Sequence, residues 1–293
     1  MSATISPSTG QRYGLRRVCR IWGAPRSTIF YRRQDRPAPR RRGPKPIIPD
    51  DTLLGMIRED LAKSPFREEG HRKPYYRMKH ERKIRVSATR VLRIMRENNL
   101  LSPNRAPKGE PNTHDGTITT TKPLEMWGTD GTLAQTVKEG TVWIFGAIEH
   151  WNAEIMGLHA SKSGDRFEAM EPIRQGIKKC YGKFTAQIAA GLALRCDHGS
   201  QYTSDYFQTE LKHFGIRQSL AYVAEPQTNG VAERFWKTLK KQVLEGRIYQ
   251  TLDDLREALK AFMDLYNRQW RLEKLGGRTP EEARKAWFTK QAA

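Results

Sequence analysis

Cysteine is scarce in this chain, and long hydrophobic runs are missing from it. The 293 residues include three cysteines, Cys19, Cys180 and Cys196, which are far apart and odd in number. None of them has the Cys-x-x-Cys or Cys/His spacing of a zinc site, so we expect reduced thiols. No apolar run approaches the ~20 residues that span a bilayer, and the N-terminus lacks the apolar stretch of a signal peptide. These absences predict a soluble, unsecreted protein of the cytoplasm.

Several catalytic motifs are also missing. The sequence contains no glycine-rich phosphate loop, no Ser or Cys nucleophile elbow and no His-Glu-x-x-His pair. Their absence argues against P-loop nucleotide hydrolysis, acyl transfer on a serine and zinc-dependent proteolysis.

Acidic residues are few in the N-terminal part of the chain. The net charge is +20, and residues 1–123 hold 28 Lys and Arg against 11 Asp and Glu, whereas residues 124–293 hold 24 against 21. A basic block of this kind suits a polyanion, because neutralised phosphates release their counterions. Its clusters are interrupted by proline and form no long amphipathic helix, which favours nucleic acid over a membrane surface.

Two short helices around a turn are predicted for residues 14–34, within an N-terminal motif that we place at 11–35. Gly23 can end the first helix, and Pro25 suits the first turn of the second. The length fits a helix-turn-helix, whose second helix would offer Arg26 and Ser27 to a DNA groove. A basic helical hairpin that recognises no bases fits the spacing equally well.

A proline-rich basic segment, residues 36–49, follows as an extended linker. Its arginines Arg40, Arg41 and Arg42 are suited to lie along a phosphate backbone. A second linker, rich in Pro, Thr, Asn and Gly, is expected at 106–122.

A second helical module is predicted between these linkers, at residues 50–105. Leu53, Ile57 and Leu61 recur at helical spacing, and Ser87 can cap a later helix. That later helix carries Arg90 and Arg93 on its polar face. They form either a solvated surface or a DNA surface, and the regional charge favours DNA.

From residue 123 the pattern changes to alternating strands and helices. Three short strands at hairpin spacing come first, then a helix over 165–181 and a strand that ends at Asp197. A helix over 204–214, a strand near 216–222 and a long helix from about 230 complete a domain at 123–248. The fold class is therefore mixed α/β, with a C-terminal helical segment at 249–293.

Three acids occupy notable places in that domain. Asp130 is expected at the end of the first strand, Asp197 ends the fourth, and Glu233 lies one turn into the long helix. Each has a simple alternative role: a turn residue, an Asx-turn before Gly199, and a helical ion pair with Lys237. Together, two strand-end acids and a helical acid suit the clamp for two divalent ions, about 4 Å apart, that phosphoryl transfer uses.

Basic residues accompany Glu233 on its helix. Lys237, Lys240 and Lys241 gather on the same polar face, opposite an apolar stripe. They are candidates for binding DNA phosphates, the alternative being a solvated helix surface. Asn229, in the loop before the helix, is a further candidate contact.

The acids lie in three sequence blocks, WGTDGT, DHGSQYTS and NGVAERFWKTLKKQ, that resemble the motifs of DDE transposases and retroviral integrases. The second and third acids are separated by 35 residues, a spacing common in those enzymes. The chain is most similar to bacterial transposases of the insertion-sequence-three family, specifically the product of the second reading frame. LRRVCRIWGAPRSTIFYRR, IRVSATRVLRIMRENNL and LGGRTPEEA also resemble segments of that family, so the likeness covers nearly the whole chain.

This resemblance implies an RNase H-like integrase core, a mixed five-stranded sheet with flanking helices, preceded by helix-turn-helix modules. It implies that Asp130, Asp197 and Glu233 bind two Mg²⁺ or Mn²⁺ ions. The expected activity is strand cleavage at the terminal inverted repeats of a mobile element, followed by attack of the freed 3′-hydroxyl on target DNA. The implied partners are double-stranded DNA, further copies of the chain in a homodimer or higher oligomer, and the upstream reading-frame product. The implied location is the bacterial cytoplasm, at the nucleoid when DNA is bound.

The sequence departs from the family pattern at two places. His198 follows the second acid where many relatives carry Arg or Asn, and Trp270, Arg271 and Leu272 replace an Arg-Pro-His run. Two other functions stay open from the residues alone. One is a catalytically silent relative that holds or regulates element ends, and the other is an RNase H-like nuclease that acts on RNA–DNA hybrids.

Overall fold

The computed structural model describes residues 3–33, 47–102, 120–220 and 230–292. The chain divides into two compact units, Met1–Pro49 and Asp50–Ala293. The candidate DNA contacts Arg40, Arg41, Arg42 and Asn229 lie outside the described residues.

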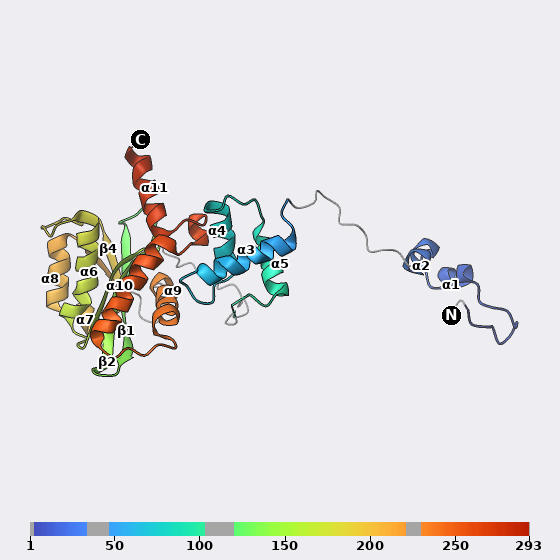
Figure 1. The fold of residues 1–293 in the computed structure, drawn as a ribbon, viewed down its shortest axis with the longest axis horizontal. Helices are drawn as coiled ribbons and strands as arrows, with labels where there is room; N and C mark the ends of the chain where they lie inside the picture. Colours follow the sequence, from blue (N-terminus) through green and yellow to red (C-terminus); the bar gives the residue numbers. More distant parts are fainter. Residues whose placement is uncertain (1–2, 34–46, 103–119, 221–229, 293) are drawn as a thin grey trace. The chain divides into compact units, whose positions relative to one another are not determined.

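The first unit contains two short helices, α1 (Leu15–Ile21) and α2 (Arg26–Arg33) (Figure 1). Between them Gly23 has φ +62°, a left-handed conformation that glycine adopts without steric cost. The Ala24 N–H bonds to the Cys19 carbonyl, 3.0 Å away, and closes the turn. The predicted helix–turn–helix arrangement is confirmed at the level of secondary structure.

The second unit begins with three helices, which we call the helical module (residues 50–102). They are α3 (Asp50–Lys63), α4 (Arg72–His80) and α5 (Ala88–Glu97). Leu53, Ile57, Met78, Val91 and Met95 form its buried interior. Ser87 caps α5 as predicted, because its hydroxyl accepts a hydrogen bond from the Arg90 N–H at 3.2 Å.

A five-stranded sheet forms the centre of the second unit. Its strands are β1 (Met126–Thr136), β2 (Gly140–Glu149), β3 (Ile155–Ser161), β4 (Ala193–Cys196) and β5 (Arg217–Leu220). The strand order is β3-β2-β1-β4-β5. β1, β2 and β3 pair antiparallel, whereas β4 and β5 run parallel to β1. This mixed sheet is the RNase H-like fold expected from the sequence.

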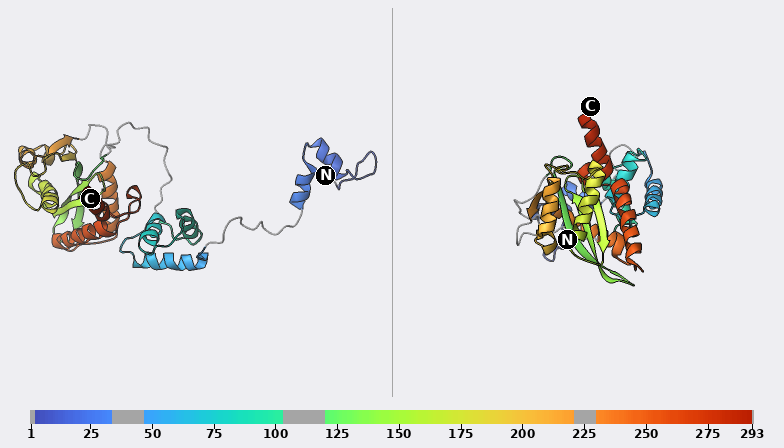
Figure 2. Two further views of the ribbon diagram at one scale, coloured as in Figure 1. Left: turned by 90° about the horizontal axis from the view of Figure 1, so that it is seen from above. Right: turned by 90° about the vertical axis from the view of Figure 1, so that its left-hand side faces the viewer.

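Helices cover both faces of the sheet (Figure 2). One face carries α6 (Arg166–Tyr181), the short α7 (Ser200–Thr203) and α8 (Asp205–Phe214). The other carries α9 (Gly230–Leu239), its π-helical continuation η2 (Lys240–Leu244) and α10 (Leu252–Gln269). A short 3₁₀ turn, η3 (Glu273–Leu275), and α11 (Pro280–Ala292) end the chain.

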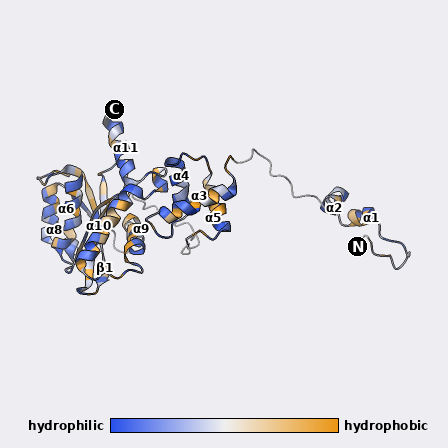
Figure 3. Cartoon of the chain, in the orientation of Figure 1, coloured by the Kyte–Doolittle hydropathy of each residue, from blue (hydrophilic) through white to orange (hydrophobic). Residues whose placement is uncertain are grey.

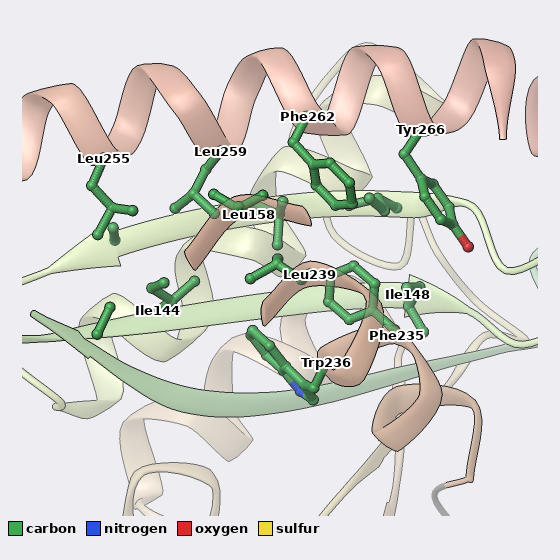
Figure 4. Close-up of a cluster of buried hydrophobic side chains, with 14 of the residues drawn as sticks. Ile144, Ile148, Leu158, Phe235, Trp236, Leu239, Leu255, Leu259, Phe262 and Tyr266 are labelled. Carbon is green, nitrogen blue, oxygen red and sulfur yellow. The ribbon is translucent and has the colours of Figure 1, made fainter. Parts of the chain in front are cut away.

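Each face has its own hydrophobic cluster, because successive side chains of a strand point to opposite sides. On β2, Ile144 and Ile148 pack toward α9 and α10, whereas Phe145 and Ala147 pack toward α6 and α8. Figure 4 shows Ile148 next to Phe235 of α9, and Ile144 on the side of the sheet that faces Leu255 and Leu259 of α10. Helix α10, in the C-terminal segment, is thus part of the core. Its hydrophobic residues alternate with hydrophilic ones along its length (Figure 3).

Close approach of α6 to the sheet depends on small residues. A Cβ on Gly157 of β3 would lie 2.3 Å from the Pro172 carbonyl oxygen, and one on Gly176 would lie 2.7 Å from the Trp127 ring. α6 begins at the N-cap Asp165 and ends at Gly182, which is left-handed. The sequence therefore sets both the limits of this helix and its distance from the sheet.

The first strand is longer than predicted. Asp130 lies in the middle of β1 and not at its end, because β1 continues to Thr136 along the edge of β2, where Thr136 pairs with Gly140. No helix among the described residues is long and apolar enough to cross a membrane.

Candidate active site

The register of β1 and β4 brings two of the predicted acids together. Met126, Trp127 and Gly128 pair in parallel with Ala193, Leu194 and Arg195. Continued by two residues, this register places Asp130 opposite Asp197, which directly follows the last residue of β4. Paired residues of parallel strands project to the same face, so both carboxyl groups face the same side of the sheet. Asp130 is thus at the end of the β1–β4 pairing, although its own strand runs on.

The helix that carries the third acid lies over the same face. Asp130 is paired across β1 and β2 with Gly146. A Cβ on Gly146 would lie 3.2 Å from the Phe235 ring and 3.4 Å from the Trp236 ring, so α9 packs directly against this part of the sheet. Glu233 is in the first turn of α9 and is exposed. Gly146 allows this approach because it has no side chain, and no pattern in the sequence marks it for this role.

The charges of the three acids act on one another. The pKa of Asp130 is raised to about 6, and burial is the largest cause. The hydrogen bond that Asp130 accepts from the Gly131 N–H lowers this pKa, whereas the negative charge of Asp197 raises it. Lys240 lowers the pKa of Asp130 and Glu233 raises it, both more weakly. Asp130, Asp197 and Glu233 therefore share one electrostatic environment, and Lys240 is the basic residue that belongs to it.

Local backbone structure fixes Asp197. Its Oδ1 accepts a hydrogen bond from the Gly199 N–H at 2.9 Å, which is the Asx-turn considered from the sequence. Asp197 and His198 are both exposed. An Asx-turn leaves the second carboxylate oxygen available, so this structural role is compatible with binding an ion.

Tyr202, a buried residue of the cluster between the sheet and α6 and α8, is close enough to the two aspartates for their charges to act on it. Its side chain is fully buried, and burial raises its pKa well above the ordinary value, with further increases from the charges of Asp130 and Asp197. The ring contacts Phe207 edge-on, with 5.3 Å between centroids. The sequence motif that contains Tyr202 did not reveal that the residue is fully buried and feels the charges of the acids.

The three predicted lysines differ in their surroundings. Lys237 and Lys240 are exposed, on α9 and at the start of η2. Lys241 is paired with Glu68 of the helical module. The role of Lys241 as a DNA contact stays a prediction. It requires the ion pair with Glu68 to break, or Lys241 to contact Glu68 and a phosphate at once.

The predicted DNA contacts of the helical module are also engaged by acids. Arg90 donates to Asp50 Oδ1 at 2.6 Å, and Arg93 donates to Asp50 Oδ2 at 2.5 Å. In the first unit, Arg26 and Ser27 are exposed, and the Arg26 guanidinium lies 5.3 Å from the centre of the Phe30 ring. These four residues remain predicted DNA contacts.

The altered C-terminal segment has a structural role that the sequence did not reveal. Arg271 is 7% exposed, donates to the Gly277 carbonyl at 2.9 Å and pairs with Glu81 and Glu282. Trp270 contacts Phe66 edge-on, with 4.8 Å between centroids, and the buried Lys73 lies over its ring. Trp270 and Arg271 thus attach the helical module to the core.

Oxygen donors make the acid cluster suitable for a hard cation. Within the described residues, no three acidic, histidine or cysteine side chains are gathered closely enough to hold an ion as they stand. Carboxylates are the ligands that Mg²⁺ prefers. Burial first, and the charges of Asp197 and Glu233 after it, raise the pKa of Asp130, and a divalent cation would relieve both costs of the charged form. The donor set therefore fits a divalent ion.

The chain was compared with known proteins. The integrase core domain family model matches residues 214–280, which include Glu233. The transposase of insertion sequence IS629 from Shigella sonnei is 24% identical over 288 residues, covering 95% of this chain and 94% of the relative. The transposase of IS904 from Lactococcus lactis subsp. lactis (strain IL1403) is 28% identical over 162 residues, 55% of this chain and 61% of the relative. Transposase InsF of IS3A from Escherichia coli (strain K12) is 23% identical, and 54% of its length is spanned.

Solved structures similar to this chain include the catalytic core domain of BIV integrase, with 20% identity and a TM-score of 0.43, covering 58% of this chain and 99% of that one. The HTLV-2 integrase catalytic core domain in complex with magnesium has 17% identity and a TM-score of 0.42, covering 56% and 97%.

The sheet topology and the matched domain define a protein with an RNase H-like integrase core. The chain is similar to bacterial insertion-sequence transposases, those of IS629, IS904 and IS3A among them.

Proposed function

We propose that this chain is a DNA transposase that binds the terminal inverted repeats of a mobile element, cleaves a strand there and transfers it to target DNA. The observation that carries the proposal is the β1–β4 register, which sets Asp130 opposite Asp197 on the face covered by the helix of Glu233. The similarity to insertion-sequence transposases supports the same activity.

The three acids are proposed to hold two Mg²⁺ or Mn²⁺ ions. When bound, such ions activate the attacking oxygen and stabilise the leaving oxygen of a phosphodiester. Asp130 supplies a half-buried carboxylate that is ionised above pH about 6. Asp197 is oriented by the Gly199 N–H, and Glu233 is presented by the first turn of α9.

Basic residues next to the acids are proposed to position the DNA. Lys237 and Lys240 lie on the exposed side of α9 and η2, and the Lys240 charge already acts on Asp130. Lysine ammonium groups bind phosphates as point charges, without reading the bases. We therefore expect these two lysines to hold the scissile strand against the acids.

Assembly is part of the proposal, because two element ends must be brought together. We expect at least a homodimer on DNA, with the upstream reading-frame product as a further partner.

Strand cleavage tests the proposed function. A labelled duplex carrying the terminal repeat that flanks the gene is incubated with Mg²⁺ and wild type, Asp197→Asn or Glu233→Gln. Cleavage should fall about 100-fold or more in both variants, since metal ions contribute several kcal/mol to such reactions, while DNA binding is retained. Glu257→Gln, which changes an exposed acid on α10, should cleave like wild type.

Three results would contradict the proposal in different ways. Cleavage by the acid variants at the wild-type rate would remove the three acids from the chemistry. Tight binding without cleavage, even with the upstream product added, would indicate a silent end-binding relative. Preferred cleavage of an RNA–DNA hybrid would indicate an RNase H-like nuclease.

A further inference from the structure

Six of the thirteen Lys and Arg residues of the helical module form ion pairs within the protein. Arg77 pairs with Asp60 and Glu69 in a half-buried cluster, and Arg82 pairs with Glu59. The remaining pairs join Lys63 to Glu59, Arg72 to Glu273, Arg90 to Asp50, and Arg93 to Asp50 and Glu97. Neighbouring acids already neutralise the charges of these side chains. The pairs stabilise the helical module and, through Arg72 and Glu273, its attachment to the rest of the second unit.

Several exposed cations of the module have no acidic partner within the part of the chain that the structure describes, and three of them surround one cleft. The cleft has a volume of about 500 Å³ and lies where the chain passes from α4 to α5. Lys79, Lys83 and Arg85 line it and are exposed. Among the described residues none of the three has an acidic partner. The other lining residues are Tyr75, Ile84, Val86 and Ser87.

The walls of the cleft are held in place by backbone contacts. After α4 the Ile84 N–H bonds back to the Met78 carbonyl at 2.9 Å, and Met78 itself is fully buried. Lys83 has φ +55°, a left-handed conformation that turns the chain at this point. On the far side the Ser87 cap fixes the start of α5. The three cations are therefore displayed by a folded connection between two helices.

The lining suits a sugar–phosphate backbone. Lys79, Lys83 and Arg85 offer three positive charges, and Ile84 and Val86 are half-buried apolar groups that fit a deoxyribose. No acid, asparagine or glutamine is among the lining residues, so nothing in the lining repels a phosphate and the three cations dominate its charge. Contacts of this kind set the register of a protein on DNA and carry no sequence information.

We propose that the cleft between α4 and α5 binds a backbone segment of duplex DNA and is the main DNA contact of the helical module. Arg90 and Arg93 then serve chiefly to fix α5 to α3 through Asp50. This inference rests on the proposed function, since it assumes that the chain acts on duplex DNA.

Salt-dependent binding to a mixed-sequence 30-base-pair duplex in EDTA tests the proposal. The cleft variant combines Lys79→Gln, Lys83→Gln and Arg85→Gln. The control combines Arg58→Gln, Arg67→Gln and Arg96→Gln, which removes the same charge from exposed positions outside the cleft that also have no acidic partner among the described residues. All six side chains are exposed, and matched thermal unfolding of the two variants verifies that both are folded.

The cleft variant should bind at least about tenfold more weakly, with the slope of log Kd against log salt reduced by about 2 to 3, since each lost phosphate contact contributes about 0.9. The control should change Kd by less than about threefold. An equal loss of duplex affinity in both variants, or no loss in the cleft variant, would overturn this inference. The proposed function would still stand in that case if the wild type binds and cleaves the duplex. Absence of duplex binding by the wild type would overturn both.

Discussion

Asp130 is the acid of the proposed catalytic cluster whose surroundings link it to the other two. Its carboxyl is half-buried, is held by the Gly131 N–H at 2.7 Å and is repelled by Asp197 and Glu233. Asp50 has a lowered pKa through its hydrogen bonds from Arg93 and Arg90. Asp130 has a raised one, first because it is buried and then because the charges of Asp197 and Glu233 act on it.

This difference predicts how stability changes with pH. The pKa of Asp130 is about 6 in the folded protein, against an ordinary value of 3.8. Between pH 3.8 and pH 6 the carboxyl is therefore protonated in the folded protein and ionised in the unfolded chain. The contribution of this carboxyl to the free energy of unfolding therefore falls as pH rises from about 4 to 6. Asp130→Asn should be more stable than wild type at pH 7.5 in EDTA, by about 1 to 3 kcal/mol, and equal to it near pH 3.5.

Urea unfolding at the two pH values measures this difference, with Glu257→Gln as the control. An Asp130→Asn protein that is less stable than wild type at pH 7.5 would show that the Gly131 bond outweighs the repulsion.

At the scale of elements, local signals predicted the helices well, whereas strand ends depended on distant partners. Ser87 and Asp165 are N-caps, and Gly182 and Gly23 end helices, so short-range chemistry was sufficient there. Asp130 was misplaced at a strand end because the length of β1 is set by β2, which pairs with it as far as Thr136. The meeting of Asp130 with Asp197 follows from the β1–β4 register, which only the tertiary structure specifies.

The attachment of the helical module was similarly beyond sequence patterns. Phe66, 8% exposed, belongs to the hydrophobic cluster of α9 and α10, and it reaches Trp270 across about 200 residues of chain. No periodicity in either segment indicates the other. The unusual Trp-Arg-Leu segment is explained by this contact and by the two ion pairs of Arg271.

Phe66→Ala should therefore destabilise the whole second unit and not the module alone. We expect the free energy of unfolding to fall by about 3 kcal/mol, with residues 50–293 still unfolding in a single calorimetric transition. Phe288→Ala, at a side chain 48% exposed on α11, should have little effect. Two separate transitions for the module and the core in the wild type would show that the contact does not couple them.

At the scale of the whole molecule, charge and chemistry are divided along the chain. Residues 1–123 carry most of the net positive charge, and the acid cluster lies in the nearly neutral remainder. Composition alone predicted this division. It could not predict which cations are neutralised internally, because ion pairs such as Arg90 with Asp50 and Lys241 with Glu68 join residues that are distant in sequence.

The central claim is that the three acids hold the divalent ions of strand cleavage, and a change of ligand tests it most directly. Asp197→Cys replaces an exposed carboxylate by a thiolate, a softer ligand that Mn²⁺ accepts more readily than Mg²⁺. Cleavage of the terminal-repeat duplex is measured with each ion, and Asp197→Ala is the control. We predict that Asp197→Cys loses about 100-fold or more in Mg²⁺ and regains at least about tenfold in Mn²⁺, whereas Asp197→Ala stays inactive in both. Equal activity of the two variants in both ions would contradict metal binding by Asp197.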